Sequence, residues 1–238
     1  MGLKDKQPMG IFDWSPLEEF APIWLTDRLV VIYSDQCEKR ISKNAIPIKI
    51  NRSFTFGTGG HPSTRGAVHG IIYAVRQKYV DPTNATFIDL GDTSGLMSII
   101  ANHMGFNPVY LAAEQERTQN EAEANIVLND CAAMITEPST LFGVAQYHRE
   151  TNQVFDVRPE IICTIQGGSP LVRQYLSDCY DLLVDGGVLI WAGHQPKTTG
   201  KTRAALEEYF DDIEHLICDG WPVAICRKTK LKEPKEND

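Results

Sequence analysis

The residues whose types and spacing suggest chemistry lie in one short stretch of the chain, residues 54–64, which reads FTFGTGGHPST. Its three glycines are followed at once by His61 and Pro62. Glycine lets a ligand approach the backbone, and a proline suits the first turn of a helix, where free N–H groups attract anions. The stretch therefore predicts an anion-binding corner at a helix start. On the pattern alone, an ordinary glycine-rich turn before a capped helix is an equal alternative.

A second glycine-containing turn, residues 91–95, directly follows an apolar strand-like stretch and precedes an apolar helical pattern. Strand, glycine turn and helix in this order form the nucleotide-binding opening of doubly wound α/β folds. Glu114 and Glu116 follow the next predicted strand. An acidic side chain there can accept hydrogen bonds from a ribose diol, so the pattern predicts a binding site for a nucleotide-like ligand.

Strands and helices alternate along the rest of the chain, which is typical of a mostly parallel sheet. The predicted strands span residues 27–33, 45–50, 86–90, 109–112, 134–136, 161–165, 188–192, 215–218 and 223–226. One predicted helix follows the first glycine stretch and runs to Tyr79, and the others span residues 96–104, 117–128, 170–183 and 203–210. The last two strands have no helix between them, which indicates an antiparallel hairpin at the sheet edge.

Three segments are expected. Residues 1–53 form an N-terminal arm packed on the main domain, because this stretch is too short for an independent domain and too apolar for a disordered tail. Residues 54–228 form the main domain, and residues 229–238 a disordered tail rich in lysine and glutamate.

Composition argues against several functional classes. The chain carries 23 basic and 31 acidic side chains, a net charge of −8, which argues against a nucleic-acid partner. No apolar run approaches membrane-spanning length, and no signal-peptide core is present. The six cysteines contain no CxxC pair, which indicates reduced thiols in a cytoplasmic protein, and no histidine or cysteine spacing predicts a metal site.

These motifs resemble those of the ribosomal protein L11 methyltransferases, which are class I S-adenosylmethionine-dependent enzymes. Residues 56–64 are similar to the family's FGTGxHP[TS]T signature at every fixed position, and residues 87–99 align without gaps to its first cofactor motif. The similarity runs from about Trp14 to Lys228 and lacks the family's separate N-terminal substrate-recruiting domain. The resemblance implies a Rossmann-like, doubly wound, mostly parallel seven-stranded sheet that binds S-adenosylmethionine and a protein amine or small-molecule acceptor.

The resemblance also implies the site residues. It assigns cofactor binding to Phe56, Gly57, Thr58, Gly59, His61, Asp89, Gly91, Ser94, Gly95 and either Glu114 or Glu116. It implies a catalytic position for Thr164 and His61 and no metal. Thr164 stands where the family has an asparagine beside the amine that is methylated.

Two further departures from the family concern the second glycine turn. Thr93 replaces its middle glycine, where backbone and ligand are expected to be close, and Asp92 adds a carboxylate near the expected carboxylate of the cofactor. Three hypotheses therefore stay open. The protein is an active methyltransferase, or a methyltransferase-fold partner subunit that has lost transfer, in a homo- or hetero-oligomer, or it binds another anionic ligand in the same pocket.

Other conspicuous residues have plainer predicted roles. Trp191 and Trp221 are expected to be packing anchors, with a pocket wall near the strand ends as the alternative. His194 is expected to be a surface or core-edge side chain. Glu121 and Glu123 are expected to lie on a solvated helix face.

Overall fold

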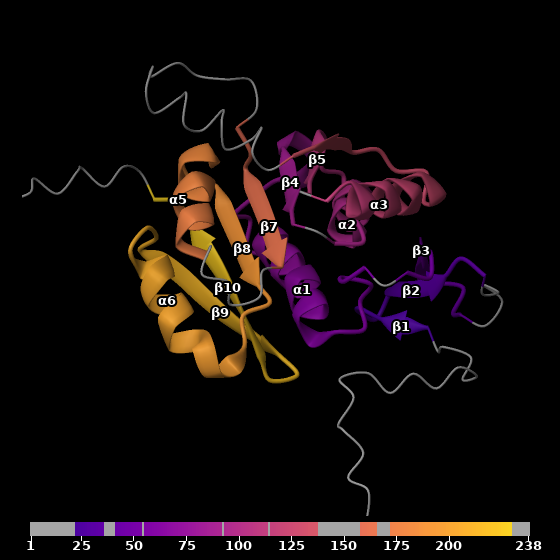
Figure 1. Ribbon diagram of the computed structural model, residues 1–238, viewed down its shortest axis with the longest axis horizontal. Helices are drawn as coiled ribbons and strands as arrows, with labels where there is room; N and C mark the ends of the chain where they lie inside the picture. Colours follow the sequence, from indigo (N-terminus) through magenta and orange to yellow (C-terminus); the bar gives the residue numbers. More distant parts are fainter. Residues whose placement is uncertain are drawn as a thin grey trace, which may run out of the picture.

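The structure is a computed structural model that describes residues 22–35, 41–53, 55–91, 93–113, 115–137, 158–165 and 172–229, with backbone only for residues 172–174 (Figure 1). Some residues named above lie outside the described part: Trp14, Cys37, Phe54, Asp92 and Glu114, together with residues 1–21 of the arm and the tail from residue 230.

The centre of the fold is a seven-stranded sheet with the order β6-β5-β4-β7-β8-β10-β9. The strands are β4 (Phe87–Leu90), β5 (Val109–Ala112), β6 (Met134–Thr136), β7 (Ile161–Ile165), β8 (Val188–Ala192), β9 (Asp212–Cys218) and β10 (Trp221–Arg227). The first five strands of that order are parallel, and β10 runs antiparallel to β8 and β9. The predicted doubly wound α/β sheet with an antiparallel edge hairpin is confirmed.

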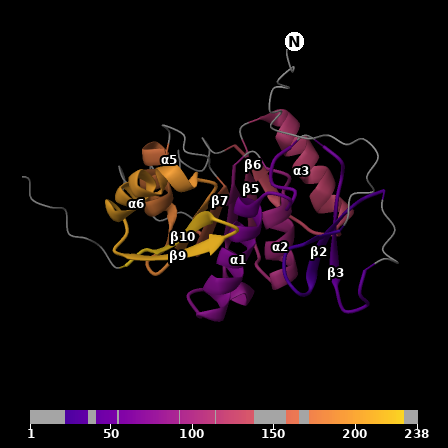
Figure 2. The ribbon, with the colours of Figure 1, turned by 90° about the horizontal axis from the view of Figure 1, so that it is seen from below.

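Helices cover both faces of this sheet (Figures 1 and 2). On one face lie α1 (Pro62–Arg76), α2 (Leu96–Met104) and α3 (Glu116–Leu128), and on the other α5 (Val172–Leu182) and α6 (Thr199–Glu207). Short 3-10 turns occur at η2 (Pro82–Asn84) and η3 (Pro196–Thr198). Because both faces are covered, every residue of β4, β7 and β8 is buried, which explains the continuous apolar runs of these strands.

Two helices differ from the sequence prediction by more than two residues at one end or at both. The helix predicted to reach Tyr79 ends at Arg76, because Lys78 adopts a φ of 60°, a left-handed conformation that cannot continue a helix. The helix predicted at residues 203–210 begins earlier, at Thr199, directly after η3, and ends at Glu207. Such shifts are expected because capping and tertiary contacts decide where a helix begins and ends.

The described part of the N-terminal arm forms a second, three-stranded sheet of β1 (Ile23–Trp24), β2 (Leu29–Tyr33) and β3 (Ile46–Ile50). β2 is the central strand, antiparallel to β1 and parallel to β3. Pro47 therefore lies on an edge strand, as a residue without a backbone N–H requires. Val31 and Ile48 belong to the same apolar cluster as Ile71 of α1, so the small sheet shares one core with the main domain.

Candidate active site

The two glycine motifs of the sequence are hydrogen-bonded to each other at the carboxyl end of β4. The Ser94 backbone N–H donates to the carbonyl of Phe56 at 2.9 Å. The Ser94 hydroxyl donates to the carbonyl of Gly57, also at 2.9 Å, and this bond is buried. The loop of residues 56–61 and the turn of residues 91–95 thus form one unit, although they are far apart in the sequence.

Close packing reinforces this junction. Gly57 has a φ of 91°, and a Cβ atom built on it would lie 3.0 Å from the Cβ of Thr93. Thr93 is 3% exposed and is not among the non-glycine residues with positive φ. Its backbone therefore needs no glycine, and its side chain lies against the loop.

His61 begins helix α1 as its N-cap, with φ −81° and ψ 140°. Its Nδ1 accepts a hydrogen bond from the Ser63 backbone N–H at 3.2 Å and lies 2.7 Å from the Ser63 hydroxyl. The ring centroid lies 5.3 Å from that of Phe56 and 4.4 Å from that of Trp221. Burial, and then the charge of Arg65, lower the pKa of His61, which favours the neutral ring whose Nδ1 accepts the hydrogen bond of the cap.

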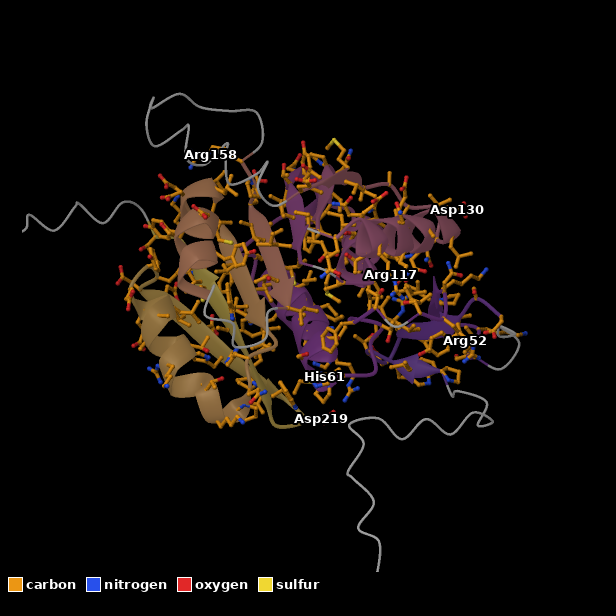
Figure 3. The ribbon with its side chains drawn as sticks, viewed as in Figure 1. Arg52, His61, Arg117, Asp130, Arg158 and Asp219 are labelled. Carbon is orange, nitrogen blue, oxygen red and sulfur yellow. The ribbon has the colours of Figure 1, made fainter. Side chains whose placement is uncertain are left out.

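Arg65 fastens the other side of the loop to the β9–β10 turn. One Nη1 hydrogen bond reaches the Gly60 carbonyl at 2.7 Å and another reaches that of Gly59 at 3.4 Å. The same guanidinium forms an ion pair with Asp219, which lies close to His61 in Figure 3. Gly59 also packs on the small sheet, because a Cβ there would lie 3.0 Å from the Leu25 Cδ2 atom. The loop is therefore held from three sides, and its middle residue Thr58 is half-buried.

Asp89, in β4, positions the glycine turn by binding the first turn of the helix that follows it. Its Oδ2 accepts hydrogen bonds from the Ser98 backbone N–H at 3.1 Å and from the Ser98 hydroxyl at 3.0 Å. Burial raises the pKa of Asp89 to about 7, against the opposing effect of the two donors. Because Ser98 lies in the first turn of α2, Asp89 supplies the cap that Gly95, the helix N-cap, cannot provide. Gly91 donates its N–H to the Ala112 carbonyl at 2.8 Å, which ties the turn to β5.

Helix α3 connects the turn to the small sheet. Asn125 is 1% exposed; its side-chain amide donates to the Ser94 carbonyl at 3.0 Å and accepts from the Asn51 backbone N–H at 2.8 Å. One turn further on, Asn129 exchanges two hydrogen bonds with the backbone of Lys49, at 2.8 Å and 2.7 Å. These hydrogen bonds explain why asparagine occurs at position 125 of α3 and at its C-cap, position 129.

The prediction of a fully solvated acidic face on α3 was wrong for one of its two residues. Glu121 accepts a hydrogen bond from the Thr55 hydroxyl and forms an ion pair with Arg117 at 3.2 Å, whereas Glu123 is exposed. Glu116 is the first residue of α3 and is exposed, so the helix dipole stabilises its charge. Ala113 is buried. Of the two candidate ribose-binding acids, Glu114 lies outside the described residues and Glu116 within them.

Buried polar atoms that lack a partner gather at one edge of the sheet. Within the described residues these atoms are the hydroxyls of Thr64, Thr93 and Thr164, Nε1 of Trp191 and Nδ1 of His194. Thr164 and Trp191 are each one residue from the carboxyl end of their strand, His194 follows β8, Thr93 follows β4, and Thr64 lies in the first turn of α1. Buried polar groups are normally hydrogen-bonded, so this concentration indicates a ligand site and fits a cofactor that carries polar groups.

Sequence reasoning proposed Thr164 as a site residue but did not propose Thr64 or His194, and for Trp191 it favoured packing over a pocket wall. His194, predicted at the surface or core edge, is 1% exposed. Burial lowers the pKa of His194 to about 4, with a further contribution from His215. No sequence pattern shows which buried polar atom will lack a partner, because that depends on neighbours from other strands.

Two other kinds of site are absent from the described residues. No three His, Cys, Asp or Glu side chains are grouped so that they could hold a metal ion. In the same part of the chain, no helix has the length and apolar character needed to cross a membrane.

A family model described as "Ribosomal protein L11 methyltransferase (PrmA)" matches residues 12–229. A curated relative of that name from Bacillus pumilus is 24% identical over 212 residues, covering 88% of this chain and 62% of the relative. One from Listeria welshimeri is 26% identical over 211 residues, with the same 88% and 62% coverage. The chain therefore spans about 62% of the length of these curated relatives.

Two solved structures share the fold. A ribosomal protein L11 methylase from Lactobacillus delbrueckii subsp. bulgaricus superposes with a TM-score of 0.72 at 22% identity, covering 88% of this chain and 100% of the other. A T. thermophilus 16S rRNA N2 G1207 methyltransferase in complex with AdoMet and guanosine gives a TM-score of 0.58 at 16% identity, covering 73% and 45%. Identities this low support the shared fold alone.

Proposed function

The chain belongs to the ribosomal protein L11 methyltransferase family, and on this premise we propose that it binds S-adenosylmethionine where loop 56–61 meets turn 91–95 and transfers the methyl group to an acceptor. The observation that carries the proposal is the pair of hydrogen bonds from Ser94 to the carbonyls of Phe56 and Gly57. These bonds join the two motifs that define the family's cofactor site into one rigid unit.

The roles of individual residues follow from their positions. We assign cofactor contacts to the backbone of Gly57, Gly59 and Gly91, and to the N-terminus of α2 at Gly95, where free N–H groups attract an anionic group. We assign the ribose hydroxyls to Glu114 or Glu116. The remaining cofactor contacts fall to Phe56, Thr58, His61 and Ser94, and Asp89 holds the turn through Ser98. When bound, the cofactor supplies an electrophilic methyl group, and the chain supplies position.

The acceptor in this proposal is a protein amine or a small molecule, and ribosomal protein L11 is the first protein to test because the curated relatives carry its name. Thr164 lies one residue before the end of β7, next to β4, and is the side chain we place beside the acceptor. His61 remains neutral and keeps the loop in place. We place the protein in the cytoplasm, in keeping with the free thiols of the five described cysteines.

Calorimetric titration with S-adenosylmethionine and S-adenosylhomocysteine tests the proposal. Micromolar binding of both ligands is expected, and no heat at millimolar ligand would overturn it. Ser94→Ala should weaken binding by about fivefold to tenfold, the value of one hydrogen bond. The matched control is Thr199→Ala, which removes a similar hydroxyl-to-carbonyl bond of 2.8 Å to Pro196, outside the site. Equal losses in both variants would remove the junction from the site.

A second candidate function is a cofactor-binding partner subunit that has lost transfer. Thr164 favours this alternative, because its hydroxyl replaces the family's asparagine and has no described partner. Incubating cell extract with the protein and methyl-labelled cofactor separates the two functions. A labelled product supports transfer, whereas cofactor binding without any labelled product supports the partner subunit.

A further inference from the structure

Three polar atoms without a partner in the described part of the chain lie near the carboxyl ends of β7 and β8, and two of them, on Thr164 and Trp191, face α5 and α6. Thr164 of β7 is the register partner of Trp191 of β8, so the two side chains point to the same side of neighbouring strands. Trp191 belongs to the apolar cluster with Leu206 of α6, which identifies the face. Leu90, the last residue of β4, is the other register partner of Thr164, so this row begins one strand from the glycine turn.

His194 follows the end of β8 by two residues. The chain turns at Gly193, which has a φ of 93°, and His215 lies close enough to His194 to lower its pKa. His215 is paired with Ala224, which is in turn paired with Trp191, so His215 continues the row across the sheet. Thr164 and Trp191 are therefore neighbours across β7 and β8, His194 follows Trp191 by three residues, and each of the three is at most 1% exposed.

The three atoms without a described partner all belong to uncharged groups. Thr164 offers a hydroxyl that can donate or accept, Trp191 an indole N–H that can only donate, and His194 a neutral imidazole Nδ1. The nearest charged side chains around His215, Arg203 and Glu207 of α6, are bonded to each other at 2.6 Å. An amide complements this set, since its carbonyl can accept from the indole and its N–H can donate to the hydroxyl or the imidazole.

We propose that Thr164, Trp191 and His194 form a subsite for an uncharged amide group of the methyl acceptor. The inference rests on the proposed function, because the subsite belongs to an active site only if the cofactor binds at turn 91–95. Leaving a buried donor or acceptor without a partner is costly, and three groups in this state imply that a ligand group completes them. A carboxylate would meet one fixed donor and no cation among these three residues, so the subsite selects amides over acids.

The test follows the indole N–H signals of the full chain by NMR during titration with acetamide. Trp191→Phe assigns the signal of Trp191, and the signal of Trp24, which is 44% exposed, is the internal control. A saturable shift confined to Trp191 is expected, with acetate, the charged isostere, binding at least about tenfold more weakly. Thr164→Val should weaken acetamide binding by about fivefold to tenfold, whereas Thr164→Ser, which keeps the hydroxyl, should stay within about twofold.

Other results would overturn the subsite. These are an absent or non-saturable Trp191 shift, an equal response to acetate, or an indole that contacts only a long-lived buried water. Titration with S-adenosylhomocysteine reports separately on the proposed function. Cofactor binding without an acetamide response rejects the subsite alone. An acetamide response without cofactor binding rejects the proposed function and, with it, the assignment of this amide-binding site to a methyl acceptor.

Discussion

A Cβ atom built on Gly57 would lie 3.0 Å from the Cβ of Thr93, so loop 56–61 rests directly on the threonine side chain. In the sequence, Thr93 looks like a defect, because it replaces a glycine in the turn while the loop keeps its signature. In the structure, Thr93 has an ordinary φ and fills the space between the turn and the loop. The substitution thus provides a surface for the loop, and it leaves the backbone of the turn unstrained.

The first prediction concerns Thr93→Gly. Removing this buried side chain takes away the surface under Gly57 and adds backbone freedom to the turn. We expect weaker binding of S-adenosylhomocysteine and a free energy of unfolding lower by about 1–2 kcal/mol. Calorimetric titration and urea unfolding measure the two effects.

Thr93→Val is the matched control for this prediction. It preserves the shape and removes the unpartnered hydroxyl, so it should be at least as stable as the parent protein. Tighter ligand binding by Thr93→Gly would show that the threonine obstructs the site.

The second prediction concerns Gly95, where a side chain would cost free energy both through the positive φ and through contact with Ala122. This residue has a φ of 77°, and a Cβ there would lie 3.1 Å from the Ala122 Cβ and 3.2 Å from the Ala122 carbonyl oxygen. Gly105 has a φ of 97° but nothing within 4 Å. Gly105→Ala should therefore cost about 1 kcal/mol of unfolding free energy from φ alone, and Gly95→Ala about 2–4 kcal/mol.

Urea unfolding of both variants checks this prediction. Ligand binding should fall only in Gly95→Ala, because α2 and α3 must separate at the turn to accommodate the new methyl group. Equal destabilisation of the two variants would mean that the contact with Ala122 relaxes without cost.

Much of the fold could be predicted from the sequence because it depends on local signals. Strands β4, β7 and β8 are continuous apolar runs, and the glycine turn directly after Leu90 indicates a doubly wound sheet. Pro62 after His61 marks the start of α1 correctly, since proline fits the first helical position. The least accurate boundaries, at Arg76 and Thr199, depend on backbone conformations that apolar periodicity does not specify.

The site was less predictable because its geometry depends on contacts between distant segments. Sequence spacing indicates that Ser94 and Gly57 belong to cofactor motifs, but not that they bond to each other. Glu121 looks solvated on a helical pattern, and only the approach of Thr55 shows otherwise. Likewise, the unpartnered state of His194 depends on the register of β8, β10 and β9, which no local pattern fixes.

The third prediction concerns the attachment of the small sheet. Asn129→Ala removes two hydrogen bonds to Lys49 and leaves backbone groups of β3 without partners. We expect a loss of about 1–3 kcal/mol, concentrated in local opening of β3. Hydrogen exchange of the β3 amides should accelerate by at least about fivefold relative to those of β8.

Asn102→Ala is the matched control for Asn129→Ala. Asn102 also bridges segments, donating to the Ser98 and Ala132 carbonyls at 2.9 Å and 2.8 Å, but it does not touch β3. Its loss should leave exchange in β3 unchanged relative to β8. Uniform acceleration in Asn129→Ala would contradict a selective role in holding the arm.

The fourth prediction concerns the pH dependence of stability, in which Asp89 and His194 oppose each other. Burial raises the pKa of Asp89 from 3.8 to about 7, so its contribution is full below pH 3.8 and is lost as the pH rises through 7. Burial lowers the pKa of His194 from 6.5 to about 4, so its contribution is full above pH 6.5 and is lost as the pH falls toward 4. As the pH rises from about 5 to 7.5, the contribution of Asp89 to the unfolding free energy falls by about 2 kcal/mol, and that of His194 rises by about 2 kcal/mol.

Single substitutions should therefore expose opposite slopes. Asp89→Asn leaves the histidine contribution, so the variant should lose about 2 kcal/mol of unfolding free energy as the pH falls from about 7.5 to 5, relative to the parent. His194→Gln leaves the aspartate contribution, so it should gain about as much over the same range. His215, whose charge acts on His194, and Arg203 and Glu207, whose charges act on His215, are present in all three proteins and cancel in the comparison. Urea unfolding at several pH values measures the slopes. Parallel curves of unfolding free energy against pH for the three proteins would mean that the pKa of neither Asp89 nor His194 is shifted by burial.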